Sequence, residues 1–88
     1  MHAVVVSVKV NDREAATANL RENVVPRVSQ TPGFVAGYWV GLGEKGGRAV
    51  IVFESEEAAR GLADQIQSLP GDEVTFESVD VGEVIAHA

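Results

Sequence analysis

The order of two hydrophobic periodicities constrains this chain most strongly. Apolar and β-branched residues dominate four short segments, residues 3–10, 34–42, 48–53 and 74–84, which is typical of strands. Between the first two segments, and again before the last one, apolar residues recur at helical spacing. The first helical stripe contains Ala16, Leu20, Val24 and Val28. The second contains Ala59, Leu62, Ala63 and Ile66. The predicted order is therefore βαββαβ.

A chain of this order most often folds as a four-stranded antiparallel sheet with both helices on one face, the ferredoxin-like α+β arrangement. The 88 residues suffice for one domain over residues 1–88 and are too few for two. Two helices cover only one side of such a sheet, so the other side should be polar in a monomer. Here it is apolar as well, because Ala3 and Val5, and likewise Val50 and Val52, lie opposite apolar residues of their own strands. We therefore expect a homodimer joined sheet to sheet. The alternative is a monomer whose strands simply have high β-propensity.

Polar and helix-breaking residues predict where the first helix begins and ends. Asn11 is the predicted N-cap, and Glu14, three residues later, completes a variant of the capping box. Pro26 has no N–H to donate to the carbonyl of Glu22, so a kink or a restart is expected there. The Thr-Pro-Gly sequence at residues 31–33 ends the helix.

Four further signals divide the rest of the chain. Residues 43–47 are a predicted hairpin loop, Ser55 is the predicted N-cap of the second helix, and residues 70–72 are a predicted turn. The apolar positions of the last strand change parity along its length. This change predicts a bulge or a bend near Ser78.

Composition excludes several classes of protein. The chain has no cysteine, so it forms no disulfide, thiolate metal site or cysteine nucleophile. Its net charge of -6 at pH 7 has the wrong sign for neutralising phosphates, so no nucleic-acid partner is expected. No stretch approaches the ~18 apolar residues of a membrane span, and the N-terminus lacks the basic residues of a secretion signal. We expect a cytoplasmic protein with no membrane partner.

Residues 41–46 match the pattern G-x-G-x-x-G, which is typical of dinucleotide-binding loops. Such a loop aims a helix N-terminus at a pyrophosphate, whereas the segment that follows here is a predicted strand. The glycines are therefore expected to serve the hairpin.

Trp39 is the most informative single residue. Its neighbours at i±2 are Gly37 and Gly41, so the indole has room beside it or can lie across them. Two interpretations stay open: a pocket wall for a flat aromatic ligand, or a filler of the core or of the dimer interface. The sequence does not decide which sheet face Trp39 occupies, but Tyr38 must point to the opposite one.

Other side chains offer little chemistry. Arg60 and Asp64 are spaced for a surface ion pair on the second helix, and the alternative is an anion-binding Arg60. Asn11 lies where it would polarise a substrate oxygen, although capping already explains it. No histidine pair has metal-ligand spacing and no serine lies in a nucleophile elbow, so neither a metal nor a hydrolytic triad is expected.

Three stretches together resemble a known superfamily: the valine-rich first strand, Pro32-Gly33-Phe34, and the Val-Phe-Glu-Ser-Glu-Glu-Ala sequence at residues 52–58. Over nearly its whole length the chain is similar to the dimeric α+β barrel superfamily, and within it to antibiotic biosynthesis monooxygenase-like domains. The resemblance implies a barrel of two packed sheets, with a pocket between sheet and helices in each subunit. Some members oxygenate polycyclic phenols or quinols without metal or flavin, and others cleave haem or isomerise small acids. Haem-degrading members carry a histidine in the second-helix region. The histidines here are His2 and His87, so we expect neither haem nor another cofactor.

Three functional hypotheses follow. The first is a homodimeric binding or regulatory protein for a small aromatic or hydrophobic ligand, held in a pocket between sheet and helices. The second is a cofactor-independent monooxygenase of a polycyclic phenol or quinol, and the third is an assembly module without a ligand. The candidate pocket residues are Trp39, Tyr38, Phe53, Leu62, Asn11 and Arg60.

Overall fold

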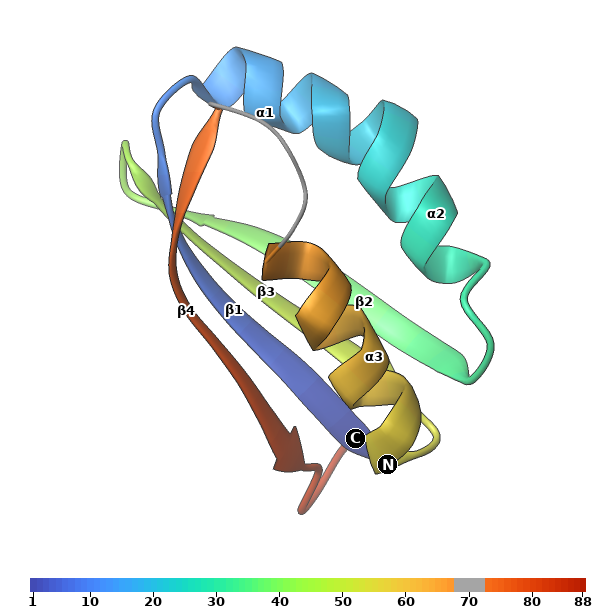
Figure 1. Cartoon of the computed structure of the whole chain (residues 1–88). Helices are drawn as coiled ribbons and strands as arrows, with labels where there is room; N and C mark the ends of the chain where they lie inside the picture. The colour runs from blue at the N-terminus through green and yellow to red at the C-terminus, as the bar shows by residue number, and fades with distance from the viewer. Residues whose placement is uncertain (68–72) are drawn as a thin grey trace.

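The computed structural model describes residues 1–67 and 73–88 (Figure 1). The elements are β1 (His2–Val10), α1 (Arg13–Asn19), a π-helical turn η1 (Leu20–Val24), α2 (Val25–Ser29), β2 (Phe34–Leu42), β3 (Gly46–Phe53), α3 (Glu56–Gln67) and β4 (Val74–Glu83). The first predicted helix thus consists of three consecutive helical pieces. With that refinement, the predicted βαββαβ order is confirmed.

The four strands form one sheet in the order β2-β3-β1-β4, and every neighbouring pair is antiparallel. Both helical regions lie on the same side of this sheet, with α1, η1 and α2 forming one long rod and α3 a shorter one (Figure 1). The predicted ferredoxin-like α+β fold is therefore confirmed. No helix in residues 1–67 and 73–88 is long and apolar enough to cross a membrane.

The core lies between the sheet and the helices. Its largest fully buried side chains are Val4, Ile51 and Phe53. The predicted stripe of the second helix is confirmed, because all four of its residues on α3 are buried. Burying apolar surface contributes roughly 25 cal/mol of stabilising free energy per Å². This burial is the main contribution that holds α3 on the sheet.

The first helix begins one residue later than the sequence indicates. Asp12, and not Asn11, is its N-cap, and the Asp12 side chain accepts a hydrogen bond from the Ala15 N–H at 3.1 Å. Asn11 is used elsewhere: its N–H donates to the Glu73 carbonyl at 2.7 Å and its Nδ2 donates to Thr75 Oγ1 at 3.0 Å. The predicted capping box was wrong because Asn11 ties β1 to the start of β4.

The helix around Pro26 differs from the predicted kink or restart, because it widens into the π-helical turn η1 just before the proline. Val25 donates its N–H to the carbonyl of Leu20, five residues back. The backbone stays in the helical region through Val24 and Val25, so the rod continues into α2 without a break. Because the proline has no N–H, the chain widens by one π turn before α2 begins.

The predicted caps and turns hold with small shifts. Ser55 Oγ accepts a hydrogen bond from the Ala58 N–H at 3.2 Å, as expected of the N-cap of α3. The hairpin loop is shorter than predicted, because β3 already begins at Gly46. The register between β1 and β4 shifts by one residue next to Ser78, which confirms the predicted bulge. The turn predicted at residues 70–72 lies outside the described residues.

The sheet face away from the helices is uncovered. The exposed fractions of its large apolar side chains are 40% for Val5, 37% for Val50, 47% for Val40, 48% for Leu42 and 66% for Tyr38. All of these lie on β1, β2 and β3, whereas β4 adds polar residues such as Asp80, directly across from Val5. The second apolar face expected from the sequence is therefore present on three of the four strands. We call it the outer face.

Candidate ligand-binding site

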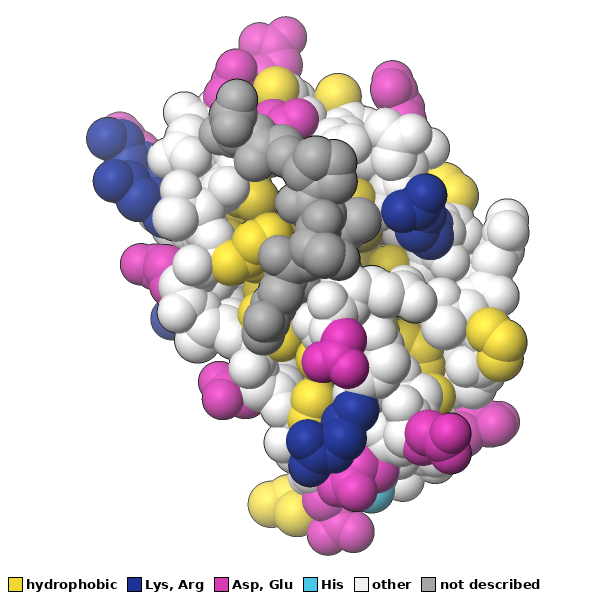
Figure 2. Space-filling view, viewed as in Figure 1, with side chains coloured by type: hydrophobic (Ala, Val, Ile, Leu, Met, Phe, Trp, Pro, Cys, Tyr) yellow, Lys and Arg dark blue, Asp and Glu magenta, His cyan; other side chains and the backbone are white. Residues whose placement is uncertain are grey.

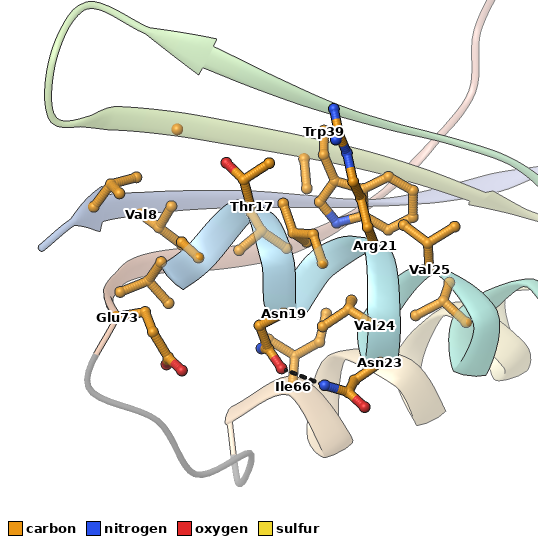
Figure 3. A pocket seen from close by; sticks show the side chains of 18 of the residues that line it. Val8, Thr17, Asn19, Arg21, Asn23, Val24, Val25, Trp39, Ile66 and Glu73 are labelled. Carbon is orange, nitrogen blue, oxygen red and sulfur yellow. Dashed lines mark hydrogen bonds between the residues drawn. The ribbon is translucent and has the colours of Figure 1, made fainter. Parts of the chain in front are cut away.

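A cavity of about 680 Å³ lies between the inner face of the sheet and the helices. Every strand and helix contributes to its lining, with the long rod of α1, η1 and α2 forming one wall and the sheet the opposite one (Figures 1 and 3). Hydrophobic side chains are visible at the surface between α1 and α3 (Figure 2). Small residues on both walls leave this space unfilled, among them Ala16 on α1 and Ala49 and Gly47 on β3.

The stripe of the first helix explains why the cavity is apolar. Ala16 and Val28 are buried as expected, but Leu20 and Val24 are only half-buried. Both Leu20 and Val24 line the cavity. Leu20 therefore faces the cavity, and Val24 lies at its border, where it also packs against the core.

Trp39 occupies the inner face of the sheet and lines the cavity (Figure 3). Its indole lies across Gly37, because a Cβ added to that glycine would stand 2.9 Å from both Cη2 and Cζ3 of the ring. The ring is half-buried and packs against the core. A flat aromatic surface thus forms part of the wall, where the sequence predicted room for it.

Arg13 also lines the cavity, and sequence reasoning missed it. Its guanidinium donates hydrogen bonds to the hairpin carbonyls of Gly43 and Gly46 at 3.1 Å each, and to that of Glu44 at 3.1 and 3.3 Å. The group lies over Gly41, where an added Cβ would stand 2.7 Å from Arg13 Nη1. No local signal reveals this contact, because Arg13 and Gly41 come from different elements.

The same hairpin accounts for the G-x-G-x-x-G pattern. Gly41 leaves room for the Arg13 guanidinium, and Gly43 has a positive φ of 65°, which favours glycine. A Cβ on Gly46 would overlap the carbonyl oxygen of Leu42. All three glycines therefore serve the hairpin, as predicted, and no phosphate-binding helix follows them.

Polar side chains of η1 and its flank also line the cavity. Asn23 Nδ2 donates a hydrogen bond to Asn19 Oδ1 at 2.9 Å on the side of α3 (Figure 3). Arg21 leaves η1 on the side of β2 (Figure 3). Sequence reasoning missed all three residues. The available signal was Pro26, since a proline disturbs the helical hydrogen bonds before it and π-helical turns are frequent at functional sites.

The structure brings together only two of the six residues singled out from the sequence. Trp39 and Leu62 both line the cavity. Phe53 is fully buried beneath it, where it packs edge to face against Phe34 with ring centroids 6.2 Å apart.

The other three candidates lie elsewhere. Tyr38 is on the outer face, opposite Trp39 as expected. Asn11 binds Thr75 at the entrance to β4. Arg60 is exposed on α3 and pairs with Glu56 at 3.4 Å, and not with Asp64 as the spacing suggested.

The donor atoms around the cavity do not fit haem iron. Among the described residues that line it there is no histidine, methionine or tyrosine. His2 lies instead at the start of β1, with Nε2 3.8 Å from Glu56 Oε2. In the same described part of the chain, no group of three or more His, Cys, Asp or Glu side chains is arranged to hold a metal ion.

Comparison with known proteins identifies the fold. No protein-family model and no curated protein matches the chain. Among solved structures, the haem degrader MhuD from Mycobacterium tuberculosis, with two haems bound in its active site, is 20% identical. The match covers 100% of this chain and 99% of that one, with a TM-score of 0.64. A mutant of MhuD with two manganese protoporphyrin IX bound per active site is 18% identical over 100% and 98%, with a TM-score of 0.66.

A monooxygenase from the gene ActVA-Orf6 of Streptomyces coelicolor, in complex with the ligand nanaomycin D, is 16% identical. That match covers 99% of this chain and 89% of the other, with a TM-score of 0.67. The likeness runs through the whole chain. It confirms the ferredoxin-like α+β fold that the order of the elements predicts.

Proposed function

We propose that this protein binds a small aromatic or hydrophobic ligand in the cavity between sheet and helices, as one subunit of a homodimer. The observation that carries the proposal is the cavity itself, about 680 Å³ with Trp39 in its wall. Ligand pockets in proteins commonly measure ~300–1,000 Å³ and are mainly apolar with a few polar groups. Proteins of the same fold with haem, manganese protoporphyrin IX or nanaomycin D bound support this interpretation.

The intrinsic fluorescence of Trp39 tests ligand binding directly, because it is the only tryptophan in the chain. We expect planar apolar probes such as N-phenyl-1-naphthylamine to quench it with saturation. Val24→Phe places a ring in the cavity and should weaken binding at least tenfold. Val35→Phe makes the same change at an exposed position outside the cavity lining and should leave affinity unchanged. Absence of saturable quenching by every planar probe would contradict the proposal.

The outer face supports the homodimer. The chain exposes 5805 Å² in total, whereas a compact monomer of 9.3 kDa typically exposes ~5,000 Å². A stable interface removes ~800 Å² per partner, and the central apolar residues of the outer face, Val5 and Val50, are adjacent across β1 and β3. Sheet-to-sheet packing of two copies would bury them.

A second candidate function is cofactor-independent oxygenation of a polycyclic phenol or quinol. It is favoured by the likeness to a monooxygenase that holds nanaomycin D. In such a reaction the substrate supplies the electrons. An anthrone methylene would become a carbonyl, one atom of dioxygen would be inserted, and the other would leave as water. The protein's part would be to exclude water and hold the ring system against Trp39 and Leu62.

Oxygen uptake with a panel of anthrones and hydroquinones separates the two functions. A monooxygenase should consume oxygen with at least one of them, and Trp39→Ala should abolish the uptake in a folded protein. If the probes bind saturably but no substrate causes oxygen uptake, the protein binds a ligand and does not oxygenate it. A cytoplasmic location is part of the proposal and agrees with the absence of cysteine.

A further inference from the structure

Some charged side chains that line the cavity already have hydrogen-bond partners in the protein, and others do not. Among the described residues that line it are four arginines, Arg13, Arg21, Arg27 and Arg48, and two glutamates, Glu22 and Glu73. The Arg48 guanidinium donates hydrogen bonds to Ser7 Oγ and to the Gly47 carbonyl. Arg13 is committed to the carbonyls of the hairpin. The side chains of Arg21 and Arg27 make no hydrogen bond or ion pair within residues 1–67 and 73–88. Two cationic groups at this cavity therefore have their donors available.

Arg21 is the better placed of the two relative to Trp39. Its side chain extends from η1 toward β2, the strand that carries Trp39 (Figure 3). Glu22 follows it in the chain but does not pair with it, since the two are not within ion-pair distance. A guanidinium presents several N–H donors in one plane, which suits the oxygens of a carboxylate or sulfonate.

The net charge of the protein bears on what the Arg21 guanidinium does at the cavity. At pH 7 the chain carries a net charge of -6, which disfavours the approach of any anion. The sheet wall of the cavity is mainly apolar, with valines of β1, Trp39 and Ile51. The arginine that its described residues include, Arg48, already donates to Ser7 Oγ. An anionic ligand would therefore depend on a free cation beside the aromatic wall, and Arg21 is in that position.

We propose that the cavity prefers planar aromatic ligands that carry one anionic group, with the ring system against Trp39 and the anion beside Arg21. This inference rests on the proposed function and specifies the ligand class of the same site. Carboxylate and sulfonate share the chemistry that Arg21 recognises.

Two probes with the same ring system test the preference. 8-Anilinonaphthalene-1-sulfonate carries an anion, and N-phenyl-1-naphthylamine is its neutral counterpart. Both should quench Trp39 and compete for one site, and the sulfonate should bind roughly five- to tenfold more tightly at low salt. Raising the salt concentration to about 0.5 M should weaken binding of the sulfonate and leave the neutral probe within twofold.

Variants that each remove one positive charge test which arginine binds the sulfonate. Arg21→Gln should lower affinity for the sulfonate about five- to tenfold and leave the neutral probe within twofold. Arg60→Gln removes the same charge from the exposed surface of α3, outside the cavity lining, and should change neither affinity. Circular dichroism should show that each variant keeps the fold of the parent protein.

The outcomes distinguish this inference from the proposed function. If neither probe quenches Trp39, the proposed function fails. If the neutral probe binds as tightly as the sulfonate, or Arg21→Gln affects both equally, ligand binding stands and the anion preference is overturned. A loss of sulfonate binding in Arg27→Gln with none in Arg21→Gln would overturn the assignment to Arg21.

Discussion

Arg13 shows how one side chain joins two distant parts of this chain. Its guanidinium donates hydrogen bonds to the carbonyls of Gly43, Glu44 and Gly46 in the β2–β3 hairpin. We expect Arg13→Ala to lower the free energy of unfolding by about 1–2 kcal/mol, since hydrogen bonds to charged groups contribute about that much and this site is solvent-exposed. Urea unfolding measures the change. Arg60→Ala removes an exposed i,i+4 pair and should cost less than about 0.5 kcal/mol.

The packing of Arg13 on Gly41 yields a second prediction at the same scale. A Cβ at position 41 would stand 2.7 Å from Arg13 Nη1, so Gly41→Ala should displace the guanidinium and destabilise the fold by about 1 kcal/mol or more. In the Arg13→Ala background the same change should cost almost nothing, because the conflicting group is gone. A double-mutant cycle measures this coupling. Additive effects of the two substitutions would show that the guanidinium does not depend on the space above Gly41.

At the scale of elements, η1 ties the shape of the cavity to Pro26. All five residues of the π turn line the cavity, and the turn exists where the proline removes an α-helical hydrogen bond. Pro26→Ala restores an N–H that can donate to the carbonyl of Glu22. We expect a straight α-helix, a gain of about 1 kcal/mol or more in stability, and at least threefold weaker binding of N-phenyl-1-naphthylamine, because Leu20 and Val24 rotate relative to the sheet. Thermal unfolding and Trp39 quenching report the two effects separately. If Pro26→Ala is more stable but binds the probe as tightly as the parent protein, η1 does not shape the binding site.

For the whole molecule, the decisive feature is the uncovered outer face. Light scattering at micromolar concentration should report a particle of twice 9.3 kDa. Val50→Lys places a charge at the centre of this face, where burial without a partner costs several kcal/mol, so it should yield a folded monomer. Ala18→Lys adds the same charge at an exposed position of α1, on the helical side of the molecule, and should remain dimeric. A wild-type particle of 9.3 kDa would refute the sheet-to-sheet dimer.

Much of the fold could be predicted because its determinants are local. The strands, the α3 stripe, the Ser55 cap, the bulge near Ser78 and the opposite orientations of Tyr38 and Trp39 all follow from residue type and spacing. A period of two or of 3.6 assigns each side chain to a face whatever the rest of the chain does. The glycine pattern of the hairpin was also interpretable, since a following strand excludes a phosphate-binding helix.

The site depended on contacts that no local pattern contains. Asn11 binds Thr75 and leaves the cap to Asp12, and Arg13 binds a hairpin some thirty residues away. Leu20 and Val24 line the cavity and are only half-buried, although their spacing is that of core residues. A cavity is the volume that remains after distant elements have packed, so it is a property of their mutual placement. By itself, the sequence determined which face each side chain takes. Only the tertiary structure decided which of those side chains meet and where packing leaves a space for a ligand.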